Sequence, residues 1–102
     1  MTKIQVAIGD DHIYAVEGLR KIISEAKDME CVGSTTELLE LPGLVKKNLP
    51  DVLVLDIDWL GDKLAGIHIL PDIRKVHPAI KVVMITVYHE LLELAREEGA
   101  FA

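Results

Sequence analysis

An unbroken apolar segment that ends on carboxylates constrains this chain most. Residues 51–58 read Asp-Val-Leu-Val-Leu-Asp-Ile-Asp. The apolar residues do not alternate with polar ones, and the run is too short for a helix. It is therefore predicted to be a strand covered on both faces, as in the middle of a parallel sheet. Because ligands of open α/β sheets bind outside the carboxyl ends of the strands, Asp56 is the first candidate for a functional residue.

The rest of the chain alternates between short apolar segments and helical patterns. Further strands are predicted at residues 3–9, 29–34 and 81–86, and helices at residues 13–26, 42–49, 67–76 and 91–98. In the first helix the residues predicted to face inward are Val16, Leu19, Ile22, Ile23 and Ala26, and in the second they are Leu44, Val45 and Leu49. Pro42 and Pro71 suit only the first turn of their helices. Four strand–helix units predict one parallel sheet with helices on both faces.

Length and charge exclude several classes of function. The 102 residues are enough for one domain, and no apolar run approaches the roughly 18 residues that would span a bilayer. No signal peptide is recognisable, so a cytoplasmic location without membrane contact is expected. Cys31 is the single cysteine, which leaves neither an intrachain disulfide nor a thiolate metal cage. A formal charge of −6 argues against direct nucleic-acid binding by this segment.

Polar residues follow three of the predicted strands. Asp10 and Asp11 follow the first strand, Asp56 ends the third, and Thr86 ends the fourth, so all four should lie at one edge of the sheet. Carboxylates this close repel one another unless a hard divalent cation lies among them, and magnesium suits such oxygen ligands. A carboxylate beside that metal can attack phosphorus and form an aspartyl phosphate. Thr86 could then donate a hydrogen bond to the new phosphoryl oxygens.

In this order, the motifs resemble the receiver domain of bacterial two-component response regulators. The resemblance covers the whole chain and includes Asp10-Asp11-His12, Asp56, Gly66, the Ile85-Thr86-Val87-Tyr88 segment and Gly99-Ala100. It implies a flavodoxin-like α/β fold with strand order 2-1-3-4, and a fifth strand and helix beyond Ala102. Residues 1–102 would thus form one receiver domain that stops before its fifth strand. The motifs look most like receivers that are followed by a helix-turn-helix DNA-binding domain.

The resemblance also implies a role for each site residue. Asp56 would accept a phosphoryl group from a histidine kinase. Asp10 and Asp11 would hold Mg²⁺ together with Asp56 and the backbone carbonyl of Asp58, and Thr86 would be the switch hydroxyl. The domain would be a switch for an attached or separate output domain, not a turnover enzyme. If the chain ends at Ala102, we expect it to associate with a second copy through the exposed edge formed by residues 81–86.

The sequence leaves several alternatives open. Ten positions separate Asp56 from Gly66, whereas the family usually has about eight, so the shape of this loop is not predicted. Trp59 could anchor a partner or pack over its own loop. The Asp56-Ile57-Asp58 segment also resembles the first motif of haloacid-dehalogenase-type phosphatases, and a receiver-like binding module without phosphorylation is a third alternative. The four histidines, His12, His68, His77 and His89, have no metal-ligand spacing and are expected in loops or at the surface.

Overall fold

A computed structural model describes residues 2–85 and 96–100 of the chain. Four parallel strands form one sheet in the order β2-β1-β3-β4, which confirms the predicted topology. The strands are β1 (Ile4–Gly9), β2 (Met29–Thr35), β3 (Val52–Asp56) and β4 (Lys81–Ile85). All four predicted strands are present, with ends that differ by at most a few residues from the prediction. Thr86 lies outside the described residues.

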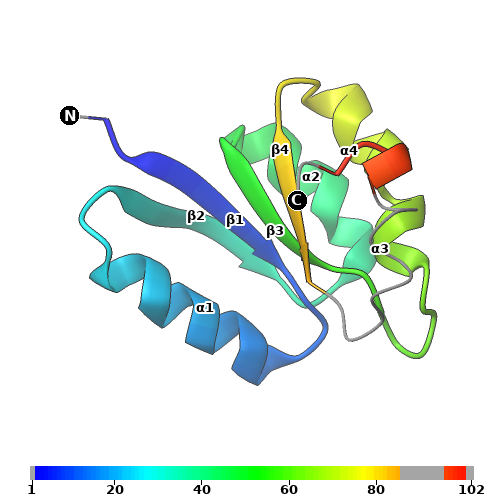
Figure 1. The fold of residues 1–102 in the computed structure, drawn as a ribbon, viewed down its shortest axis with the longest axis horizontal. Coiled ribbons are helices and arrows are strands. Elements are labelled where there is room, and N and C mark those ends of the chain that lie inside the picture. Colours follow the sequence, from blue (N-terminus) through cyan, green and yellow to red (C-terminus); the bar gives the residue numbers. More distant parts are fainter. Residues whose placement is uncertain (1, 86–95, 101–102) are drawn as a thin grey trace.

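Helices cover both faces of the sheet (Figure 1). Helix α1 (Ile13–Glu25) lies on one side, and α2 (Leu41–Asn48), α3 (Ala65–His68) and α4 (Leu70–Val76) lie on the other. A short 3-10 helix, η1 (Leu38–Glu40), precedes α2 directly. Within the described part of the chain, no helix has the length and apolar character that crossing a membrane would need.

The sheet separates two apolar clusters because successive strand residues point to opposite faces. On the α1 side, Val6 and Ile8 of β1 pack with Val16 and Ile23 of the helix. The larger cluster lies on the other side and contains Leu53 and Leu55 of β3, Val82 and Met84 of β4, and residues of the remaining helices. The two faces of β3 are thus both occupied, as the unbroken apolar run of residues 52–55 predicts.

The helices differ from prediction at three places. Ile22 was expected to face inward but is 64% exposed, because Val16 and Ile23 already define the buried stripe of α1. Leu49 was expected inside α2, yet it terminates that helix with a φ of 45° and is 53% exposed. Residues 67–76 form two helices instead of one, because Pro71 lacks the N–H that would continue the hydrogen-bond ladder.

The helix predicted over residues 91–98 falls mostly outside the described residues. Of its C-terminal end, Arg96 and Glu97 are helical, and a turn follows at Gly99, whose φ is 107° and whose N–H donates to the Arg96 carbonyl at 3.1 Å. A glycine in the left-handed region is the usual way to end a helix.

Candidate functional site

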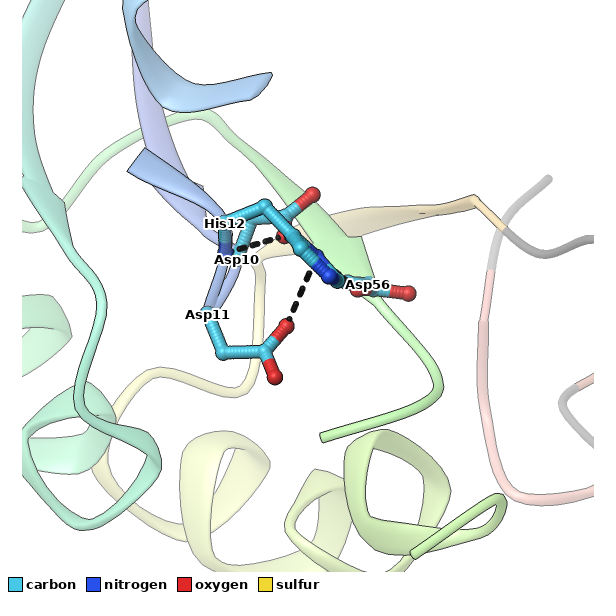
Figure 2. Close-up of side chains that lie close together, drawn as sticks. All are labelled: Asp10, Asp11, His12 and Asp56. Carbon is cyan, nitrogen blue, oxygen red and sulfur yellow. Dashed lines mark hydrogen bonds and ion pairs between the residues drawn. The ribbon is translucent and has the colours of Figure 1, made fainter. Parts of the chain in front are cut away.

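Three aspartates meet at the carboxyl edge of the sheet because β1 and β3 are neighbouring parallel strands. Gly9 pairs with Leu55, so Asp10 and Asp56 follow at the same level. Figure 2 shows Asp10, Asp11 and Asp56 pointing toward a common space, together with His12. One ligand atom from each of these four residues lies within 4.8 Å of every other. The side chains of the three aspartates are only 7%, 10% and 13% exposed, respectively.

His12 is the residue that sequence reasoning missed. Its Nδ1 atom lies 3.1 Å from Asp10 Oδ1, 3.0 Å from Asp11 Oδ1 and 3.9 Å from Asp56 Oδ2 (Figure 2). The backbone N–H of His12 also donates to Asp10 Oδ1 at 2.9 Å, which fixes the start of α1 over the aspartates. The sequence signal that could have placed His12 at the site is its position directly after the aspartate pair. The spacing between the histidines does not indicate this place.

The crowding of these groups changes their proton affinities. Burial, followed by the negative charge of Asp10, raises the pKa of Asp56 to about 7. The hydrogen bond with Asp10, followed by the negative charge of Asp11, raises the pKa of His12. The negative charge of neighbouring aspartates contributes to both shifts. A cation placed among the carboxylates would offset this charge.

Asp11 supplies direct support for a cation. Its Oδ2 accepts a hydrogen bond from the Leu60 N–H at 2.9 Å, whereas the buried Oδ1 accepts no hydrogen bond and lies 3.0 Å from His12 Nδ1. A buried carboxylate oxygen without a hydrogen bond is costly unless another group, such as a metal ion, completes its interactions. Carboxylate oxygens are the ligands that Mg²⁺ prefers. The residues of this site therefore fit a hard divalent cation.

The loop after β3, whose shape the sequence left open, makes a tight turn over residues 59–62. Trp59 and Asp62 exchange two backbone hydrogen bonds of 3.1 and 2.9 Å. The two central residues, Leu60 and Gly61, have φ values of 51° and 82°, as in the turns that close β-hairpins. The turn brings the Leu60 N–H to Asp11, so the extra length of this loop is used at the edge of the site.

Two residues of this loop, Trp59 and Gly66, lie close to the backbone of Asp56 and Ile57. The indole Nε1 of Trp59 donates to the Asp56 carbonyl oxygen at 2.6 Å, and the side chain is 2% exposed. Of the two alternatives from the sequence, Trp59 therefore follows the second and packs over its own loop. Gly66 donates its N–H to the Ile57 carbonyl at 2.8 Å, and a Cβ at this position would collide with the Asp56 carbonyl oxygen. Only glycine allows this close approach.

The remaining candidates lie as follows. The backbone N–H of Asp58 donates to Asp56 Oδ1 at 3.2 Å, so Asp58 is next to the cluster. Thr86 and His89 are outside the described residues. His68 is exposed on α3, and His77 Nε2 lies 2.8 Å from the Pro50 carbonyl oxygen. Among the described histidines, His12 alone belongs to the cluster of potential metal ligands.

Comparison with protein families and curated relatives gives a consistent result. The family model described as "Response regulator receiver domain" matches residues 6–101. The transcriptional regulatory protein BtsR of Escherichia coli K12 is 36% identical over 98 residues, which are 96% of this chain and 40% of that protein. A protein-glutamate methylesterase/protein-glutamine glutaminase of Albidiferax ferrireducens is 34% identical over 90 residues, which are 88% of this chain and 23% of that protein. The chain thus spans less than half the length of either relative.

Solved structures share the fold. The response regulator domain of Thermotoga maritima CheB superposes with a TM-score of 0.81 and 29% identity, over 97% of this chain and 75% of that one. A LuxR-family two-component response regulator from Aurantimonas sp. SI85-9A1 superposes with a TM-score of 0.86 and 25% identity, over 97% of this chain and 71% of that one. Sequence and structure comparisons therefore point to the same family.

Proposed function

Because this chain belongs to the family of response regulator receiver domains, we propose that it accepts a phosphoryl group on Asp56 and so switches an output in two-component signalling. The observation that carries the proposal is the convergence of Asp10, Asp11 and Asp56 from the ends of β1 and β3. Receiver domains are regulators, and we propose that this one is a switch without turnover of a separate substrate.

The acidic cluster could bind a metal, and we assign Mg²⁺ to it. Asp10, Asp11 and Asp56 would supply carboxylate oxygens, and the backbone carbonyl of Asp58 is proposed as a further ligand. The buried Oδ1 of Asp11, which accepts no hydrogen bond, supports this assignment. When bound, such an ion supplies positive charge that neutralises the phosphoryl oxygens and favours the ionised form of the aspartates.

Asp56 has the properties that a nucleophile needs. Its side chain is 13% exposed, which limits competing water, and its Oδ1 accepts the Asp58 N–H, which orients the carboxylate. We propose that the other oxygen, Oδ2, attacks phosphorus while the bond from phosphorus to the imidazole nitrogen of a kinase phosphohistidine breaks. The imidazole leaves with the electron pair of that bond. The hydrogen bonds from Trp59 and Gly66 hold the backbone around Asp56 during this step.

Thr86 is proposed as the hydroxyl that responds to the phosphoryl group. The described part of β4 ends at Ile85, which pairs with Asp56, and Thr86 is the next residue in the chain. The pairing of Ile85 with Asp56, together with the place of Thr86 directly after Ile85 in the sequence, supports this role. A Thr86→Ala variant should still become phosphorylated but should lose the response of the output.

Partners follow from the family and the relatives. We propose a cytoplasmic histidine kinase pathway as the phosphoryl source, and a transcriptional output attached to or separate from this chain, by analogy with BtsR. The output, not this acidic segment, would contact DNA. Association of two copies of the chain through the edge of β4 stays a prediction. It is supported by Ile85 of β4, which is 41% exposed on the α1 side of the sheet. A monomer in sedimentation at high concentration would contradict it.

The proposal is tested by intact mass after incubation with Mg²⁺ and acetyl phosphate. We expect addition of one phosphoryl group to the wild type and none to Asp56→Asn, which keeps the size and one acceptor oxygen of the side chain. Asp72→Asn is the matched control, because Asp72 lies exposed in the first turn of α4. Chelation of the metal should stop the reaction. Equal labelling of wild type and Asp56→Asn would refute the proposed phosphoacceptor.

A further inference from the structure

The position of His12 in the acidic cluster is not explained by phosphoryl transfer to Asp56. Its Nδ1 lies 3.1 Å from Asp10 Oδ1 and 3.0 Å from Asp11 Oδ1. An imidazole nitrogen carries at most one proton, so it cannot donate a well-aligned hydrogen bond to both oxygens. Asp10 Oδ1 accepts the His12 backbone N–H in addition to its hydrogen bond with Nδ1, and Asp11 Oδ1 is the buried oxygen without a hydrogen bond. A metal ion could interact with the imidazole nitrogen and both carboxylate oxygens at once.

The distances match those between ligands that share one metal ion. In an octahedral shell with metal–ligand bonds of about 2.1 Å, neighbouring ligands lie about 3.0 Å apart and opposite ligands about 4.2 Å apart. The separations of His12 Nδ1 from Asp10 Oδ1, Asp11 Oδ1 and Asp56 Oδ2 are 3.1, 3.0 and 3.9 Å. One ligand atom from each of the four residues lies within 4.8 Å of the other three. The imidazole nitrogen therefore lies where a ligand of such an ion would lie.

A nitrogen ligand changes which metals the site favours. Mg²⁺ prefers oxygen ligands, whereas imidazole is a good ligand for divalent first-row transition metals. We propose that the His12 imidazole is a ligand of the metal at this site and gives it a preference for Mn²⁺ and Co²⁺ over Mg²⁺. This inference rests on the proposed metal site. It adds His12 as a ligand and a metal preference to that site. Mg²⁺ would bind through oxygen atoms alone, whereas the transition metals would bind through oxygen atoms and the His12 nitrogen.

A rival explanation makes a different prediction. The His12 ring is 73% exposed, so it could act as a counter-charge that leaves whenever any divalent ion enters. Removal of the ring would then strengthen the binding of all divalent ions to a similar degree. If His12 is a ligand, its removal weakens the binding of Mn²⁺ and Co²⁺ and spares that of Mg²⁺. The ratio of affinities, and not any single affinity, separates the two explanations.

The experiment is calorimetric titration of the metal-free protein with Mg²⁺, Mn²⁺ and Co²⁺, for wild type, His12→Ala and His68→Ala. His68 is the matched control, because it is an exposed histidine of α3 outside the cluster. His12→Ala should retain the fold, since the His12 side chain makes no capping hydrogen bond to α1. We expect this variant to bind Mn²⁺ and Co²⁺ at least about tenfold more weakly, the size of effect known for residues around metal sites, with Mg²⁺ binding changed less than about twofold.

A spectroscopic measurement reports the bond itself. Pulsed electron paramagnetic resonance of the Mn²⁺-loaded protein should detect a directly bonded nitrogen, and the signal should change when histidine is labelled with ¹⁵N. The signal should be absent from His12→Ala and present in His68→Ala. Absence of this coupling in the wild type would overturn the inference.

The outcomes separate this inference from the proposed function. Mg²⁺ binding to the wild type with equal changes for all three metals in His12→Ala would overturn the role of His12 and leave the Mg²⁺ site intact. Failure of every divalent ion to bind the wild type would remove the metal site, and this inference with it.

Discussion

The indole nitrogen of Trp59 donates a hydrogen bond of 2.6 Å to the backbone carbonyl oxygen of Asp56. Trp59 is almost fully buried, so this hydrogen bond holds the backbone of the proposed phosphoacceptor while its carboxylate faces the cluster. The loop that carries Trp59 also places the Leu60 N–H on Asp11. One loop thus holds two of the three aspartates, and its integrity should matter for both stability and phosphorylation.

Replacement of Trp59 by phenylalanine tests this relationship. Trp59→Phe keeps an aromatic ring in the core but removes the indole donor to the Asp56 carbonyl. We expect the free energy of unfolding to fall by about 1–2 kcal/mol, from the lost hydrogen bond and the smaller ring. Urea denaturation followed by circular dichroism measures this change, since Trp59 is the single tryptophan and its fluorescence is lost. An unchanged midpoint would show that the hydrogen bond contributes nothing.

Gly66 is the position of the site region least able to accept a side chain. A Cβ there would collide with the Asp56 carbonyl oxygen and lie 2.7 Å from Ile57 Cα, and both are backbone atoms that cannot rotate away. We expect Gly66→Ala to lower the free energy of unfolding by about 2–4 kcal/mol, as overpacking in a core does. Phosphorylation by acetyl phosphate should also slow, because the backbone of Asp56 must shift.

Gly18→Ala is the matched control. Gly18 is exposed in the middle of α1, and a Cβ there meets no atom within 4 Å. Alanine is the better helix former, so this substitution should raise the free energy of unfolding by about 0.5–1 kcal/mol. If both substitutions destabilise the protein equally, the close contact at Gly66 is not the cause.

The raised pKa of Asp56 predicts a pH dependence of stability without metal. The pKa is about 7 in the folded protein and about 4 in the unfolded chain. Between these values the folded state holds the proton and the unfolded state has released it, so stability should fall as pH rises from about 4 to about 7 and then level off. Asp56→Asn should flatten this decline. Urea midpoints in the presence of a chelator measure it, and stability that rises over this range would contradict the predicted charge crowding.

The fold could be predicted because each level of the sequence pointed to the same result. Apolar runs that end in Asp10 or Asp56 specify buried parallel strands, and parallel strands bring their carboxyl ends to one edge. The order β2-β1-β3-β4 and the convergence of Asp10, Asp11 and Asp56 both follow from that pattern. The buried face of each helix could be predicted less accurately from the sequence. The predicted inward face of α1 included both Ile22 and Ile23, but of these two only Ile23 is buried against the sheet.

The parts that could not be predicted depend on individual backbone conformations. The turn at Leu60-Gly61 lacks the Asn-Gly or Asp-Gly pair typical of such turns, so nothing in the sequence marked it. Leu49 ends α2 in the left-handed region, where glycine is usual. The place of His12 depends on the backbone at the start of α1, which directs an otherwise exposed ring toward the aspartates.

The central claim is that Asp56, and no other aspartate of the cluster, receives the phosphoryl group. The most direct measurement is to incubate the protein with Mg²⁺ and acetyl phosphate, reduce it with borohydride, which converts an aspartyl phosphate to homoserine, and locate the modified residue by tandem mass spectrometry. We expect homoserine at position 56 alone. Homoserine at Asp10, Asp11 or Asp58, with Asp56 unmodified, would contradict it.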